Sequence, residues 1–279
     1  MGRLSRSLTE AVWTVGGRLP RRAGDLIARA LSWPLALLPL PGVRAWQGSV
    51  EAATGERPRP GTRRLLLENW LRNTLWSLSL AHWTDDEILA VASITDEEVD
   101  RLRESLAGPG LVLALPHMGS WDFAGAWCAT VGIKVVSVAE RLPDGLYERF
   151  RDARAGMGMD IHPVDLPGLL GVLTDDVRAG RLVCLLSDRD LSSRGVGVPW
   201  PGTDAEVGVP AGPALLARRT GADLRVASTR FEGGRLRIRV SERIDGDSAR
   251  ELMAGAVAVF ADHIAEAPGS WLMLRRYFR

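Results

Sequence analysis

The 279-residue chain is 46% hydrophobic and 25% charged, a balance that is typical of a globular protein and excludes a disordered one. Its formal net charge is +1, so no overall field favours nucleic acid as a partner. The two cysteines, Cys128 and Cys184, lie among apolar residues outside any CxxC pair. We therefore expect no disulfide framework and no metal site, and a reducing compartment fits this cysteine usage.

The chain up to residue 107 has a helical pattern. Apolar residues recur at helical spacing over 4–15, 22–39, 61–82 and 94–106. Thr95 and Glu98 resemble a capping box at the start of the last of these helices. The first residues lack a long apolar core followed by a small-residue cleavage site, so we expect no signal peptide.

The most hydrophobic stretch of the chain covers residues 26–43. It contains Arg29 and three prolines, and its uninterrupted apolar part is shorter than the roughly 20 residues that span a bilayer. We expect this stretch to lie in a membrane interface, which makes residues 1–107 a helical, membrane-associating region.

From residue 108 onward, strands alternate with helices. This alternation predicts an α/β fold, in which helices flank a mostly parallel central sheet, and we expect it to form one continuous globular unit with the N-terminal helices. The glycine-rich turn at 232–234 predicts a hairpin between the last two strands. The expected strands cover 111–116, 134–139, 182–188, 223–231 and 235–240, and the expected helices cover 120–130, 166–179, 210–220 and 247–266.

His117 and Asp122 are the candidate catalytic residues. His117 follows a predicted strand directly, where ligands bind in open α/β sheets, and Ser120 can cap the next helix with Asp122 in its first turn. A turn at Gly119 could bring the Asp122 carboxylate against the imidazole ring. A histidine held by a carboxylate can accept a proton from an alcohol. No GxSxG motif supplies a serine nucleophile, so we infer that the substrate's own hydroxyl attacks.

The segment HMGSWD (117–122) resembles the HxxxxD/E motif of glycerolipid and lysophospholipid acyltransferases. Residues 105–279 also resemble, in colinear order, the lipid A biosynthesis acyltransferase family. The Asp-Arg-Asp sequence at 188–190 and the Trp-x-Met-Leu sequence at 271–274 look most like actinobacterial phosphatidylinositol mannoside acyltransferases. The matching segments are Tyr147–Gly158, Ser187–Leu191, Gly195–Gly202, Pro210–Ala222 and Pro268–Leu274.

This resemblance implies an acyltransferase that moves a long-chain acyl group from acyl-CoA to a hydroxyl of a glycolipid, a mannose of phosphatidylinositol mannoside. Acyl-CoA would be a co-substrate, with no separate cofactor and no metal. The enzyme would be peripheral, at the cytoplasmic face of the bacterial plasma membrane. Relatives use a further acidic residue, for which Asp188 and Asp190 are the candidates.

Arg154, Arg189 and Trp200 are candidate substrate-binding residues. The two arginines could bind a phosphate of CoA or of the phosphoinositide headgroup, or could instead pair on the surface with Asp152 and Asp190. Trp200, between two prolines, could form a lid or a wall of an acyl groove.

An acyl chain must be sheltered from water, and we expect its groove along the helix that follows His117. Helical spacing groups four residues as its lining, and the alternative is that they pack helix against sheet. These residues are Phe123, Ala126, Trp127 and Thr130.

Two other functions stay open from the sequence. In a lipid or thioester hydrolase, His117 would activate water, and free fatty acid would appear without an acceptor. In a non-catalytic lipid carrier, removal of His117 would have no consequence for activity.

Overall fold

The computed structural model describes residues 16–141, 145–190 and 195–278. In this part of the chain, seven strands form one sheet in the order β1-β9-β8-β2-β5-β3-β4. Strands β8, β2, β5, β3 and β4 are parallel, whereas β9 and β1 run in the opposite direction. The strands are β1 (Ala92–Ser93), β2 (Leu111–Leu115), β3 (Val135–Ala139), β4 (Met159–Pro163), β5 (Leu182–Leu186), β8 (Asp223–Glu232) and β9 (Arg235–Val240).

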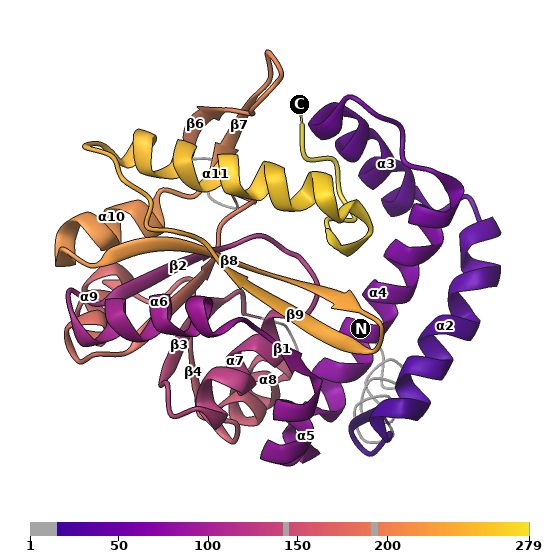
Figure 1. The fold of residues 1–279 in the computed structure, drawn as a ribbon, viewed down its shortest axis with the longest axis horizontal. Coiled ribbons are helices and arrows are strands. Elements are labelled where there is room, and N and C mark those ends of the chain that lie inside the picture. The colour runs from indigo at the N-terminus through magenta and orange to yellow at the C-terminus, as the bar shows by residue number, and fades with distance from the viewer. Residues whose placement is uncertain (1–15, 142–144, 191–194, 279) are drawn as a thin grey trace.

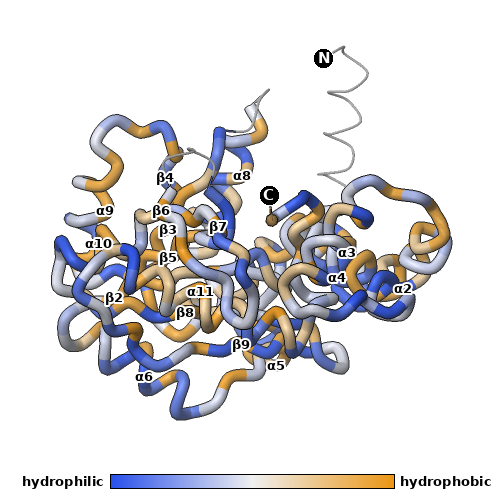
Figure 2. Tube along the Cα trace, turned by 90° about the horizontal axis from the view of Figure 1, so that it is seen from above, coloured by the Kyte–Doolittle hydropathy of each residue, from blue (hydrophilic) through white to orange (hydrophobic). Residues whose placement is uncertain are grey.

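Helices cover both faces of this sheet, which confirms the predicted α/β fold (Figure 1). Alternate side chains of β2 show why both faces are apolar. Leu111 and Leu113 pack in one hydrophobic cluster with α6 and α7, whereas Val112 and Ala114 pack in another with α9, α10 and α11. Figure 2 shows β3 and β5 as hydrophobic. The helices are α6 (Asp96–Ala107), α7 (Trp121–Thr130), α8 (Leu146–Ala155), α9 (Leu169–Arg178), α10 (Gly212–Thr220) and α11 (Ala249–Glu266).

The predicted hairpin is the antiparallel pair β8–β9. Gly233 and Gly234 make its turn with φ of +51° and +86°, in the left-handed region that favours glycine. The sequence did not predict the edge strands β1 and β4, the helix α8, or a second hairpin formed by β6 (Val196–Pro199) and β7 (Glu206–Val209).

The N-terminal helices pack beside the sheet, at the right in Figure 1. Trp46 and Leu66, from two of them, are buried in the same hydrophobic cluster as Val112 of β2. The prediction of a helix over 4–15 concerns residues outside the described part. The described helices here are α2 (Arg21–Leu37), α3 (Pro41–Thr54), α4 (Pro60–Ser79), a 3-10 turn (Leu80–His82) and α5 (Asp85–Val91).

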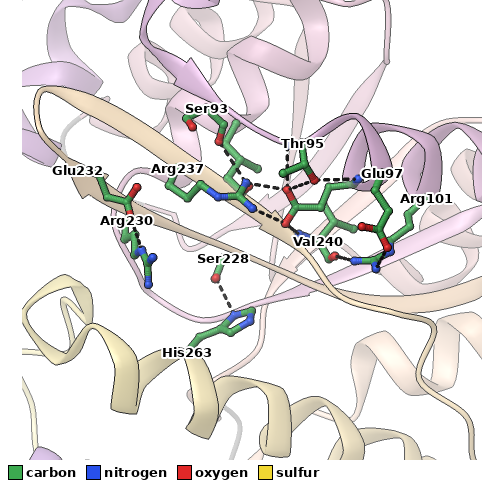
Figure 3. Close-up of polar contacts among 12 residues, drawn as sticks. Ser93, Thr95, Glu97, Arg101, Ser228, Arg230, Glu232, Arg237, Val240 and His263 are labelled. Atoms are coloured by element: carbon green, nitrogen blue, oxygen red, sulfur yellow. Dashed lines mark hydrogen bonds and ion pairs between the residues drawn. The ribbon is translucent and has the colours of Figure 1, made fainter.

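A buried ion pair fastens α6 to the sheet. Glu98 completes the predicted capping box with Thr95 and accepts a hydrogen bond of 2.8 Å from Arg237 of β9. Figure 3 labels Thr95 and Arg237, its two partners. Burial raises the pKa of Glu98, but the hydrogen bonds from Arg237 and Thr95 outweigh burial and hold the pKa below its ordinary value. Figure 3 also shows buried His263 of α11 against Ser228 of β8, at 2.7 Å.

No single helix in the described ranges is both long and apolar enough to cross a bilayer. Helices α2 and α3 together have the length and composition for a crossing, but their axes meet at a bend of 87°.

Candidate functional site

His117 and Asp188 meet because their strands are neighbours. Strands β2 and β5 are parallel, with Leu115 opposite Leu186, so the residues that follow them emerge side by side at the carboxyl edge of the sheet. The backbone continues the pairing one residue further, since the Ser187 amide donates to the Leu115 carbonyl at 2.8 Å. His117 and Asp188, each two residues beyond the paired Leu115 and Leu186, therefore come out next to each other.

The Asp188 carboxylate holds the imidazole of His117. Nδ1 of His117 lies 2.5 Å from one carboxylate oxygen, and the His117 amide donates to the other at 2.9 Å. The indole of Trp271 donates to that second oxygen, also at 2.9 Å. Asp188 is fully buried, with an exposed fraction of 0%, so these donors replace the water that its charge has lost.

The buried charge of Asp188 favours His117 as a proton acceptor. Burial raises the pKa of Asp188, but the charge and hydrogen bonds of His117 outweigh burial and lower it. Burial likewise lowers the pKa of His117, and the adjacent Asp188 carboxylate more than offsets this effect and raises it. An ionised Asp188 requires the proton on Nδ1, which leaves the lone pair of a neutral imidazole on Nε2. The ring is 27% exposed, so Nε2 can meet a substrate.

The loop that carries His117 is fixed from two sides. Gly119 has a φ of +59°, and a Cβ there would lie 2.5 Å from the Thr229 carbonyl oxygen, so only glycine fits. The Thr229 hydroxyl donates to the Met118 carbonyl and accepts from the Ser120 amide, each at 2.8 Å. From the other side, the His117 carbonyl accepts from the Leu272 amide at 2.7 Å.

The predicted contact between Asp122 and the His117 ring is wrong. Asp122 does lie in the first turn of α7, where the helix dipole favours its charge, but its carboxylate points to other partners. It accepts hydrogen bonds from Arg154 at 2.5 and 3.2 Å and from the Ser77 hydroxyl at 2.6 Å. Asp188, one of the two acidic candidates, has the place expected for Asp122. Asp190 instead accepts from the Gly195 amide at 2.8 Å.

Arg154 is not an exposed anion-binding residue. Its side chain is 2% exposed, is paired with Asp122, and has its guanidinium carbon 3.5 Å from the ring centre of Phe150. The surface pairing with Asp152 is also wrong, because Asp152 pairs with Arg151. Arg189 is half-buried beside the site and lines two pockets.

His117 is one of the residues that line a mostly apolar pocket of about 650 Å³. The lining also includes several residues of α7, Leu102 of α6, and Ile238 and Val240 of β9. The residues of α7 that line it are Trp121, Asp122, Ala124, Gly125, Trp127 and Cys128.

The residues predicted to line an acyl groove lie mostly outside this pocket. Of the four predicted residues only Trp127 lines the pocket. Phe123 packs against Trp76 with ring centres 5.4 Å apart, Ala126 is buried in the same cluster, and the Thr130 hydroxyl donates to the Ala126 carbonyl at 3.1 Å.

Trp200 is neither a lid nor a groove wall. It is 1% exposed and stacks on Trp271 with ring centres 6.5 Å apart, and its indole donates to the Ala53 carbonyl of α3 at 2.9 Å. Its part in the site is indirect, since it supports the tryptophan that holds Asp188. No local pattern in the sequence indicates this role of Trp271, although the residue lies within one of the segments that carry the family resemblance.

Comparison with known proteins agrees with this resemblance. The sequence model of the bacterial lipid A biosynthesis acyltransferases matches residues 8–279. A phosphatidylinositol mannoside acyltransferase of Mycobacterium tuberculosis is 40% identical over 185 residues, which are 63% of this chain and 57% of the relative. One of Mycolicibacterium smegmatis is 39% identical over 186 residues, 64% of this chain and 60% of the relative. The chain thus spans under two thirds of the length of these relatives.

Replacing Asp188 with asparagine should lower the pKa of His117, because the charge that raises it is lost while burial remains. A ¹⁵N NMR titration of the imidazole measures this change. Asp122→Asn is the matched control. It should leave the pKa of His117 unchanged but reduce the free energy of unfolding by about 3–5 kcal/mol, since Arg154 loses its buried partner. A His117 pKa that responds to Asp122→Asn and not to Asp188→Asn would contradict the observed pairing.

Proposed function

Because the chain belongs to the bacterial lipid A biosynthesis acyltransferase family, we propose that it transfers a long-chain fatty acyl group from acyl-CoA to a hydroxyl of a phosphatidylinositol mannoside. The two relatives carry the name of that acceptor. The observation that carries the proposal is the His117–Asp188 pair, whose histidine lines an apolar pocket.

The proposed reaction has two proton transfers. Nε2 of His117 removes the proton of the acceptor hydroxyl as its oxygen attacks the thioester carbonyl, and the buried Asp188 carboxylate stabilises the imidazolium that forms. The tetrahedral intermediate then collapses, the carbon–sulfur bond breaks, and the imidazolium returns the proton to the departing CoA sulfur. The products are an ester and CoA, with no acyl-enzyme.

The apolar pocket is the proposed site of the acyl chain. Exposure of a long chain to water costs about 0.8 kcal/mol per methylene, so an apolar pocket lined by His117 meets the need for shelter. Its apolar lining, which includes Leu102, Ile238 and Val240, would limit the length of the chain.

We also propose peripheral association with the cytoplasmic face of the membrane, through α2. This helix exposes Leu26, Trp33 and Leu37, the last by 85%, next to exposed Arg22 and Arg29. Apolar side chains beside arginines suit the interface of an anionic bilayer.

The transfer is tested with labelled palmitoyl-CoA and phosphatidylinositol dimannoside. His117→Ala should reduce turnover by about 10²–10⁴-fold, the usual contribution of a general base, while the melting temperature shows that the variant is folded. Near-normal turnover of the folded variant would refute the role of His117. Release of free palmitate by the wild type, independent of acceptor, would identify a hydrolase instead.

The acyl pocket is tested by Ala124→Phe, which adds a ring inside the pocket. Its preferred acyl-CoA should be shorter than that of the wild type, as measured by competition among C8 to C18 donors. Thr130→Phe is the control, because it adds similar bulk on the same helix outside the pocket. If Ala124→Phe keeps the wild-type profile, or both variants change it equally, the chain binds elsewhere.

Membrane association is tested by Leu37→Glu in flotation with anionic phospholipid vesicles. Binding should weaken about tenfold or more, since full burial of a leucine contributes about 1.5–3 kcal/mol. Leu215→Glu is the control, because this leucine is 43% exposed and belongs to α10, which lies on the opposite side of the molecule from α2 (Figure 1). Equal binding by the two variants would show that α2 does not meet the membrane.

A further inference from the structure

The proposed reaction creates a negative charge that the His117–Asp188 pair does not stabilise. When the acceptor hydroxyl attacks the thioester, the carbonyl oxygen becomes an oxyanion, and enzymes that transfer acyl groups aim hydrogen-bond donors at such an oxygen. Nδ1 of His117 is held by Asp188, and Nε2 is taken by the proton of the hydroxyl. A donor for the oxyanion must therefore come from another group.

The backbone of the loop after β2 is already committed to other hydrogen bonds. The four amides of residues 117–120 all donate within the protein, over distances of 2.7 to 2.9 Å. The first turn of α7, next along the chain, carries the Asp122 carboxylate, whose charge would repel a second anion. The acceptors of the four amides are the Asp188 carboxylate, the Pro116 and Ser270 carbonyls and the Thr229 hydroxyl.

Arg189 lines the same apolar pocket as His117 and is the one arginine or lysine among its described lining residues. It follows Asp188 directly in the sequence and is half-buried. Burial lowers the pKa of His117, and the positive charge of Arg189 lowers it further, although Asp188 more than offsets both. The field of the guanidinium therefore reaches the imidazole. Within the described part of the chain, this guanidinium makes no hydrogen bond or ion pair, so it is available to a substrate.

A guanidinium is well suited to an oxyanion. It is always charged and carries five N–H donors, and a charge-assisted hydrogen bond is roughly twice as strong as one between neutral groups. In a mostly apolar pocket, little water screens this attraction. The serine hydroxyls in the lining are occupied, since Ser137 donates to the Cys184 carbonyl at 2.8 Å and Ser187 to the Leu185 carbonyl at 2.7 Å.

We propose that Arg189 is a catalytic residue of the acyl transfer, whose guanidinium donates to the thioester oxygen and stabilises the oxyanion of the tetrahedral intermediate. The inference rests on the proposed function. The hydroxyl proton goes to Nε2 of His117, while the negative charge moves onto the carbonyl oxygen beside Arg189. When the carbonyl forms again, the carbon–sulfur bond breaks and the CoA sulfur takes the proton from His117.

The test is Arg189→Met, which removes the charge and keeps a long side chain. The kcat for transfer from palmitoyl-CoA to phosphatidylinositol dimannoside should fall about 10²–10³-fold, the usual cost of one lost oxyanion donor. The KM for palmitoyl-CoA should change little, because the contact strengthens only in the transition state. Arg189→Lys keeps a positive charge and should recover part of the kcat. A KM that rises while kcat is unchanged would make Arg189 a binding residue for the anionic CoA and would overturn the proposal.

Arg141→Met is the matched control. Arg141 comes two residues after β3 at the same edge of the sheet, but it lies outside the lining of the apolar pocket. Its side chain is 52% exposed and pairs with Asp165. Its variant should keep the kcat of the wild type, and the melting temperatures should show that both methionine variants are folded. Equal losses of kcat in the two variants would show a general effect of charge and contradict a specific role of Arg189.

An infrared measurement tests the same contact without turnover. His117→Ala blocks the reaction, so palmitoyl-CoA labelled with ¹³C at the carbonyl stays intact on the protein. A donor that polarises this carbonyl lowers its stretching frequency, so the band should move to higher frequency in the double variant His117→Ala/Arg189→Met. An unchanged band would overturn the proposal.

The two measurements separate this inference from the proposed function. A wild type that transfers acyl groups while neither kcat nor the carbonyl band responds to Arg189→Met refutes the role of Arg189 alone. A carbonyl band that responds to Arg189→Met in a protein whose wild type does not transfer refutes the proposed function alone.

Discussion

The site depends on one buried charge. A carboxylate removed from water is strongly destabilising unless hydrogen bonds replace its hydration, and Asp188 is fully buried. Its donors come from two segments, the loop at His117 and the C-terminal segment at Trp271. If either segment moved away, the Asp188 charge would lose hydrogen bonds. The interaction that orients the imidazole therefore also holds the Trp271 segment against the sheet.

The support of that charge extends outward through aromatic rings. Trp271 stacks on Trp200, whose indole in turn donates to a carbonyl of α3. Another buried ion pair, between Arg154 and Asp122, joins α8 to the start of α7. A hydrogen bond from the Ser77 hydroxyl to Asp122 joins α4 to the same point. The N-terminal helices are thus connected to the carboxyl edge of the sheet by polar contacts as well as by apolar packing.

The sequence predicted what depends on local pattern and missed what depends on strand order. The hairpin β8–β9, the capping box at Thr95 and the place of His117 after a strand are all local signals. Asp188 lies 71 residues beyond His117, and only the adjacency of β2 and β5 brings them together. Helical spacing grouped residues of α7, but both faces of this helix are apolar, so the spacing could not show that Ala124 rather than Ala126 meets the pocket.

The hydrogen bond from Trp271 to Asp188 forms late in the order of synthesis. Synthesis proceeds from the N-terminus, and domains generally begin to fold in that order. All seven strands of the sheet are complete by Val240, yet the indole that stabilises Asp188 belongs to residue 271. The ribosome can therefore complete every strand of this sheet before Asp188 gains this donor. Until Trp271 has been made, the His117–Asp188 pair lacks one of the hydrogen bonds that stabilise its buried charge.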